Sequence, residues 1–215
     1  MKALLWDLDD TLLDTLEARV VALTHAYESY VGGQVDARAI WRALRGRSLS
    51  ELGRDLLGDD YLSFTEAYDD HYHSRRSSVG PFPGIPELLE WCERSGLLLA
   101  IVTSRRSWDA TEELQRSGLL KHFHAVVAWG DADLHKPDPA PVFAALDRLM
   151  VNSPEDAAFI GNSPSDIKSA KSAGCLSIAA LWGTLDEELL LDAGPEARAS
   201  SPTEIPGLIK GEVPA

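Results

Sequence analysis

Residues 3–15 read ALLWDLDDTLLDT, a short apolar run that passes directly into a cluster of acids. The run Ala3–Trp6 has the length and composition of a buried β-strand. Four aspartates follow within eight residues: Asp7, Asp9, Asp10 and Asp14. Carboxylates this close repel one another unless a cation lies among them. The stretch therefore predicts a cation-dependent site at the end of a buried strand.

Short apolar runs with helical patterns between them recur along the chain. The five runs are Ala3–Trp6, Leu97–Val102, His124–Ala128, Ala157–Ile160 and Leu176–Leu181. Strands that alternate with helices of about ten to fifteen residues indicate a parallel sheet covered by helices on both faces. Proline and glycine mark three of the helices: Pro86 to Gly96, Asp138-Pro139 onward, and Pro164 to Gly174. We therefore expect an α/β fold with a Rossmann-like three-layer core, and after Gly194 only a loop and one short helix.

Residues 15–80 break this alternation, because they contain no predicted strand. Apolar residues recur at helical spacing from Leu16 to Tyr30, and Gly32-Gly33 ends that helix. Capping residues begin three more helices: Asp36, Ser48 with Glu51, and Ser63 with Glu66. The turn-rich stretch GPFPG at 80–84 returns the chain to the sheet. We expect two domains, a core of residues 1–14 and 81–215 and a helical insert of residues 15–80.

The composition excludes several classes of partner. With a formal net charge of −14, the chain lacks the excess of basic residues that would attract nucleic acid or an anionic membrane. Cys92 and Cys175 lie far apart and outside any metal-binding spacing, which indicates buried thiols in a reducing compartment. The longest apolar stretch, Leu97–Val102, is too short to span a membrane. We expect a cytoplasmic protein, monomeric or homodimeric, without a nucleic-acid or membrane partner.

Polar side chains follow four of the predicted strands. They are Asp7 and Asp9 after the first run, Thr103 and Ser104 after the second, Lys136 beyond the third, and Asn162 and Asp166 after the fourth. In an open parallel sheet, ligands bind at the carboxyl ends of the strands. We therefore expect acids, hydroxyls, a lysine and a carboxamide to converge on one crevice.

In this order, these residues resemble the motifs of the haloacid dehalogenase superfamily of phosphatases. DLDDT at 7–11 is similar to its DxDx[TV] motif, and IVTS at 101–104 is similar to its second motif. HKPDP at 135–139 supplies the lysine of its third, and GNSPSD at 161–166 resembles GDxxxD. The resemblance covers nearly the whole chain and is greatest to the phosphoglycolate phosphatase branch. It implies that the helical insert is a first-type cap domain.

The resemblance implies a phosphatase that acts on a small phosphorylated metabolite through an aspartyl-phosphate intermediate. Asp7 would be the nucleophile, and Asp9 would be the general acid and then the general base. Thr103, Ser104 and Lys136 would hold the phosphate oxygens. The family's dehalogenases lack the second acid, so Asp9 favours phosphoryl transfer over dehalogenation.

The implied cofactor is Mg²⁺, bound by Asp7, by the backbone carbonyl of Asp9 and by position 162, with Asp166 in support. The family pattern has aspartate where this chain has Asn162. The carboxamide still offers an oxygen but removes one negative charge, so we expect weak Mg²⁺ binding and slow turnover. Asn162 also leaves open a binding protein with impaired chemistry. Asp10, where the family often has glycine, is interpreted as a turn residue.

Two arginines lie between predicted helices of the insert, in Arg45-Gly46-Arg47. In related phosphatases the matching loop contacts the leaving group, and guanidinium groups suit carboxylates and phosphates. Arg45 and Arg47 are candidates for reading an acidic substrate such as phosphoglycolate, with a solvated loop as the alternative. Arg105 is a further candidate for substrate binding. A phosphosugar mutase with the same core residues is the alternative enzyme.

Overall fold

A computed structural model describes residues 1–44 and 49–210 of the chain. The chain divides into two compact units. Met1–Leu13 and Pro81–Ala215 form the first, the α/β unit, and Asp14–Gly80 form the second, the helical unit. The divisions fall within one residue of the domain boundaries expected from the sequence.

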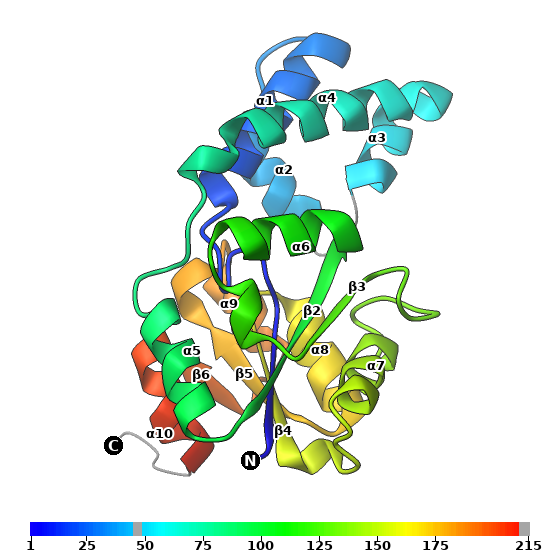
Figure 1. Ribbon diagram of the computed structural model, residues 1–215. Helices are drawn as coiled ribbons and strands as arrows, with labels where there is room; N and C mark the ends of the chain where they lie inside the picture. Colours follow the sequence, from blue (N-terminus) through cyan, green and yellow to red (C-terminus); the bar gives the residue numbers. More distant parts are fainter. Residues whose placement is uncertain (45–48, 211–215) are drawn as a thin grey trace. The chain divides into compact units, whose positions relative to one another are not determined.

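The α/β unit is built on one parallel sheet of six strands, in the order β3-β2-β1-β4-β5-β6 (Figure 1). The strands are β1 (Ala3–Trp6), β2 (Leu98–Arg106), β3 (Ala125–Trp129), β4 (Ala157–Gly161), β5 (Leu176–Ala180) and β6 (Ala197–Ala199). Within this sheet, Leu5 of β1 is in register with Ala100 of β2 and with Phe159 of β4. The strand order reverses between β1 and β4, and such a switch point is where ligands bind in open α/β sheets. The predicted α/β fold with a parallel sheet is confirmed.

Helices cover both faces of this sheet. They are α5 (Ile85–Arg94), α6 (Ser107–Arg116), α7 (Ala140–Arg148), α8 (Pro164–Ala173), α9 (Glu187–Asp192) and α10 (Ile205–Lys210). On one face, Ala3 and Leu5 pack with Val142 of α7 and Ala170 of α8 in a buried cluster. Right-handed crossovers place α5 and α6, which precede and follow β2, on the opposite face. Because side chains alternate along β1, both faces of this central strand are apolar and buried.

Two features of the sheet differ from the sequence-based expectation. Strand β2 does not end at Val102 but continues to Arg106, with a register shift against β3 between these two residues. Thr103 and Ser104 therefore lie inside the strand, at its irregular part. The sequence analysis also missed β6, because three residues, Ala-Arg-Ala, are too few to show a period.

The helical unit contains α1 (Leu16–Tyr30), α2 (Ala37–Leu44), α3 (Leu49–Leu57) and α4 (Tyr61–Arg75). Its buried side chains are mainly alanines of α1 and aromatic residues of α4, with Phe64 fully buried. Trp41 packs edge-on against Tyr68, at 5.9 Å between ring centroids, and under the guanidinium of Arg19. Asp36 caps α2 through the amide of Ala39, as expected.

The prediction that Ser63 begins a helix is wrong. Helix α4 begins two residues earlier, at Tyr61, because the 3₁₀ turn Gly58–Asp60 leads directly into it. Other 3₁₀ turns lie at Arg76–Ser78, Leu120–His122, Pro154–Asp156, Leu181–Gly183 and Pro202–Glu204. No helix in residues 1–44 and 49–210 is both long enough and apolar enough to cross a membrane.

Candidate active site

The site is built on the two central strands of the α/β unit. Asp7 directly follows β1, and its amide donates to the carbonyl of Ile160 at 3.0 Å, so the sheet ladder extends to this residue. Asn162 directly follows β4. Both residues therefore lie at the switch point between β1 and β4.

Lys136 is the centre of a buried charge cluster. Its Nζ donates to Asp7 Oδ1 and to Asp166 Oδ1, both at 2.7 Å, and to the carbonyl of Val102 at 3.1 Å. The exposed fractions of the three charged side chains are 5% for Lys136, 11% for Asp7 and 0% for Asp166. One ammonium thus lies between two carboxylates, which leaves one negative charge uncompensated in a buried place.

This arrangement raises the pKa values of both Asp7 and Lys136. Burial raises the pKa of the Asp7 carboxyl, because desolvation outweighs the attraction of Lys136 and Asp166 adds repulsion. Burial alone would lower the pKa of Lys136, but the two carboxylates outweigh it and raise that pKa. Lys136 therefore stays charged, and a further cation near Asp7 would favour its ionised form.

Asp166 connects the cluster to a helix N-terminus. Its Oδ2 accepts hydrogen bonds from the amide and the hydroxyl of Ser163, at 3.0 and 2.7 Å, in a capping box at the start of α8. Gly161 must lack a side chain, because a Cβ there would overlap Asp166. Since both carboxylate oxygens are engaged, the geometry favours a supporting role for Asp166 over direct metal coordination.

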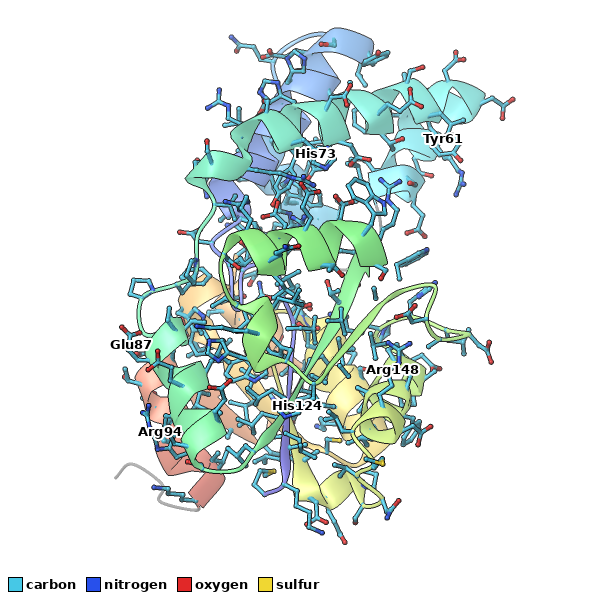
Figure 2. All side chains as sticks on the ribbon, viewed as in Figure 1. Tyr61, His73, Glu87, Arg94, His124 and Arg148 are labelled. Carbon is cyan, nitrogen blue, oxygen red and sulfur yellow. The ribbon has the colours of Figure 1, made fainter. Side chains whose placement is uncertain are left out.

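The loop between β3 and α7 carries Lys136, and several contacts anchor the residues that precede it. Near its start, Asp131 Oδ2 accepts from the amide of Ala128 at 3.1 Å and from Arg148 Nη1 at 3.0 Å. Arg148 lies on α7 (Figure 2). The rings of Trp129 and His135 stack at 3.4 Å between centroids. These contacts anchor the residues before Lys136, so its long side chain needs little ordering to reach Asp7.

A tight loop follows Asp7 and is clamped from the segment after β5. Asp10 has a left-handed backbone, with φ 57°, which explains why glycine suits this position and agrees with a turn role. Trp182 Nε1 donates to the carbonyl of Thr11 at 2.9 Å. Gly183 approaches the carbonyl of Asp10 so closely that a Cβ would overlap it. The loop geometry therefore depends on residues about 170 positions away in the chain.

Asn162 is oriented by two hydrogen bonds of this clamp. Its Oδ1 accepts from the hydroxyl of Thr11 at 3.1 Å, and its Nδ2 donates to the carbonyl of Gly183 at 3.2 Å. An aspartate could make the first contact but would set an anionic oxygen against the Gly183 carbonyl. The local structure therefore accommodates the amide specifically.

The Asp9 side chain forms a hydrogen bond with Arg105, whereas that of Asp7 forms one with Lys136. Its Oδ2 accepts from Arg105 Nε at 2.7 Å, and the two side chains are 19% and 15% exposed. The Thr103 hydroxyl oxygen accepts from the amide of Arg105 at 3.2 Å. Thr103 is buried, and Ser104 beside it is exposed. Arg45 and Arg47 lie outside the described residues.

The donor set fits a hydrated divalent ion. Asp7 has one carboxylate oxygen engaged with Lys136, and among the described residues no hydrogen bond reaches the other. That oxygen, the backbone carbonyl of Asp9 and Asn162 Oδ1 are hard donors, of the kind that Mg²⁺ takes alongside retained waters. No cluster of three or more His, Cys, Asp or Glu side chains suited to a metal occurs in residues 1–44 and 49–210.

Sequence analysis missed four residues that shape the site: Glu113, Ser163, Trp182 and Gly183. Ser163 precedes a proline and an acid three residues on, so a capping box could have been read there. No local pattern shows that Trp182 contacts Thr11 or that Glu113 lies near Arg105, because these contacts join distant parts of the chain.

Comparison with known proteins gives a family for this chain. Residues 4–180 match the model of haloacid dehalogenase-like hydrolases. A protein of Caldanaerobacter subterraneus subsp. tengcongensis, provisionally assigned as pyrophosphatase PpaX, is 31% identical over 97% of this chain and 94% of its own. The phosphoglycolate phosphatase of Vibrio parahaemolyticus is 28% identical over 95% and 94%.

Solved structures agree with this. One from Thermotoga maritima, provisionally assigned as a beta-phosphoglucomutase, is 28% identical and has a TM-score of 0.78, covering 99% of this chain and 100% of its own. The predicted resemblance and the prediction of an enzyme of this kind are confirmed. The chain belongs to the haloacid dehalogenase-like hydrolase family.

Proposed function

We propose that this protein is a Mg²⁺-dependent phosphatase that hydrolyses a small phosphomonoester through a phosphorylated Asp7. The observation that carries the proposal is the buried contact of Lys136 with Asp7 and Asp166 at the end of β1. A carboxylate so placed is a nucleophile beside a fixed cation, which is what attack on a phosphate dianion requires.

Four side chains take part in the proposed reaction. The Asp7 carboxylate forms a bond to phosphorus while the bond to the leaving oxygen breaks, and Asp9 gives that oxygen a proton. In the second half, Asp9 takes a proton from the water that attacks phosphorus, and the bond between phosphorus and Asp7 breaks. Lys136 and Thr103 hold the oxygens that do not react.

Asp7, the carbonyl of Asp9 and Asn162 would hold the metal ion. A bound Mg²⁺ would neutralise the phosphate and align it with the nucleophile. With an amide at 162, the site provides one negative charge fewer than with the aspartate of the family pattern, so Mg²⁺ binding should be weak. Because weak Mg²⁺ binding would slow turnover, the alternative is a protein that binds its ligand and has impaired chemistry. A phosphatase assay distinguishes the two.

The substrate is proposed as a small phosphorylated metabolite of the cytoplasm. The relatives are named for phosphoglycolate and for pyrophosphate, so both belong to the first panel to be tested. Cys92 and Cys175 are both free and buried, which supports a reducing compartment. Arg45 and Arg47 are proposed to read an acidic leaving group.

A phosphatase screen tests the function. Wild-type protein, with Mg²⁺ and with EDTA, is assayed for phosphate release from p-nitrophenyl phosphate, phosphoglycolate, pyrophosphate and hexose phosphates. Release that needs Mg²⁺ and is lost in Asp7→Asn supports the proposal. No release from any substrate at millimolar Mg²⁺, with a folded protein, would contradict it and favour the binding role.

The mutase alternative rests on the likeness to the Thermotoga maritima structure. A mutase returns the phosphoryl group to a sugar, so its turnover would require a sugar bisphosphate as activator. Phosphate release without such an activator favours the phosphatase.

A further inference from the structure

A line of alternating charges connects helix α6 to Asp9. Arg105 Nε donates to Asp9 Oδ2 at 2.7 Å, and Arg105 Nη1 lies 4.0 Å from Glu113 Oε1. Arg116 Nη2 lies 2.5 Å from the other oxygen of Glu113. The order is therefore acid, arginine, acid, arginine, with Asp9 at one end.

Burial makes this line rigid. The side chain of Glu113 is fully buried, and Arg105 is only 15% exposed. A buried carboxylate is costly unless it is paired; Glu113 accepts a hydrogen bond from Arg116, and its other oxygen lies at ion-pair distance from Arg105, which favours this placement of the guanidinium. The planar guanidinium has donors on two edges, so Arg105 can contact Asp9 with Nε while an Nη group faces Glu113.

The backbone also places Arg105. Its amide donates to the hydroxyl oxygen of Thr103, and the register of β2 against β3 is interrupted between Val102 and Arg106. The regular pairing resumes only at Arg106, which is in register with Trp129. The irregular segment is the one that carries Arg105.

We infer that Arg105 is a positioning residue that orients the Asp9 carboxylate for proton transfer, rather than a residue that binds substrate. This inference rests on the proposed function, in which Asp9 is the acid and base. A guanidinium that is hydrogen-bonded to Asp9 on one side and lies at ion-pair distance from Glu113 on the other has its donors directed at protein carboxylates. The inference replaces the substrate-binding role expected for Arg105 from the sequence.

The two roles have different kinetic consequences. A residue that orients a general acid matters most for poor leaving groups, because an alkoxide needs a proton and p-nitrophenolate does not. The base step is common to all substrates, since it hydrolyses the same phosphorylated Asp7. Loss of orientation should therefore slow that step and let the phosphorylated form accumulate.

The test compares Arg105→Ala with wild type on phosphoglycolate and on p-nitrophenyl phosphate. We expect kcat/KM to fall about 100-fold for phosphoglycolate and less than about fivefold for p-nitrophenyl phosphate. Rapid mixing with p-nitrophenyl phosphate should give a burst of p-nitrophenol close to the enzyme concentration. The matched control is Arg106→Ala, whose exposed side chain lies 3.9 Å from Asp109, and it should behave as wild type.

Other results overturn the inference. A raised KM for both substrates with kcat unchanged would assign Arg105 to substrate binding. An equal loss of kcat/KM on both substrates, without a burst, would mean that it only supports the local fold. If the wild type releases no phosphate at all, the proposed function fails first, so the two failures are distinguishable.

Arg105→Ala removes a cation beside the buried Glu113 carboxylate, which can destabilise the region. The double variant Arg105→Met with Glu113→Gln removes both buried charges and keeps most of the side-chain volume. It should show the same burst and the same dependence on the leaving group, with circular dichroism like that of wild type. A folded double variant with wild-type kinetics would contradict the inference.

Discussion

The two units differ in what they bury. In its described part, the α/β unit buries five acidic residues: Asp7, Asp10, Asp109, Glu113 and Asp166. In the described part of the helical unit, no acidic side chain is buried, and the interior consists mainly of alanines, leucines and aromatic rings. Burial of charge is costly and is retained where it is paired or serves chemistry.

This contrast separates two sources of stability. In the α/β unit, Asp7 and Asp166 depend on the Lys136 ammonium, 2.7 Å from each, so loss of that ammonium leaves buried charges unpaired. In the helical unit, stability depends on volume, so loss of a large side chain leaves a cavity. Removal of a charge should therefore destabilise the α/β unit by leaving its partner unpaired. Removal of a large side chain should destabilise the helical unit by leaving a cavity.

The largest effect is expected from Lys136→Met. It strands Asp7 and Asp166 in a buried place, and the free energy of unfolding in EDTA should fall by about 3–5 kcal/mol, with loss of phosphatase turnover. Urea denaturation measures the first and phosphate release the second. Lys168→Met, on the exposed side of α8, is the control and should change unfolding by less than about 0.5 kcal/mol. An equally small change for Lys136→Met would mean that the buried cluster is not held by this ammonium.

Phe64→Ala tests the helical unit in the same way. Phe64 is fully buried, and its removal should cost about 3 kcal/mol through the cavity it leaves. Hydrogen exchange should show lost protection in α1 and α4, with β1 and β4 unchanged. Leu62→Ala, on the same helix but 56% exposed, is the control. Equal loss of protection in β1 would show that the two units unfold together and would remove the contrast.

Asn162→Asp should have opposite effects with and without metal. Without Mg²⁺, loss of the donor to Gly183 should cost about 1 kcal/mol of stability. With Mg²⁺, the added charge should tighten binding by calorimetry and raise kcat tenfold or more. Asn152→Asp adds the same charge at an exposed position and should do neither. Unchanged Mg²⁺ affinity in Asn162→Asp would show that position 162 is not a ligand.

The smallest effect concerns the two thiols, both of which lie in the α/β unit. Burial raises the pKa of Cys92 to about 12 and that of Cys175 to about 11. Between the ordinary thiol pKa and these values, the native state binds more protons than the unfolded state, so stability falls as pH rises. Urea denaturation at several pH values above 9 should show this slope, reduced in the double variant Cys92→Ala and Cys175→Ala.

Thiol labelling tests the burial that raises these pKa values. At pH 8, a disulfide reagent should leave the native protein unlabelled and react with two thiols in urea. Rapid labelling of the native protein would show that the thiols are accessible.

The central part of the site could be predicted because it depends on a rule of topology. Residues at the carboxyl ends of parallel strands meet at one edge, so Asp7, Lys136 and Asp166 could be grouped from their order alone. The parallel sheet followed from strand and helix spacing in the same way.

The remainder depends on contacts that carry no local signal. Arg105 was a candidate for substrate binding, and its ion pair with Asp9 and its approach to Glu113 of α6 could not be predicted, because these contacts join distant parts of the chain. Strand β2 continues past Val102 because its pairing with β3 resumes after an irregularity, which no period in the sequence reveals. Ser63 matched a capping box, but the turn before α4 made an earlier start possible.

The identity of the phosphorylated residue tests the central claim most directly. Wild-type protein is mixed with p-nitrophenyl phosphate and Mg²⁺, quenched with acid, reduced with borohydride, digested and analysed by mass spectrometry. We predict homoserine, the product of a reduced aspartyl-phosphate, at Asp7 alone, and neither this product nor turnover in Asp7→Asn. Near-wild-type turnover in Asp7→Asn, or modification at another residue, would contradict the account.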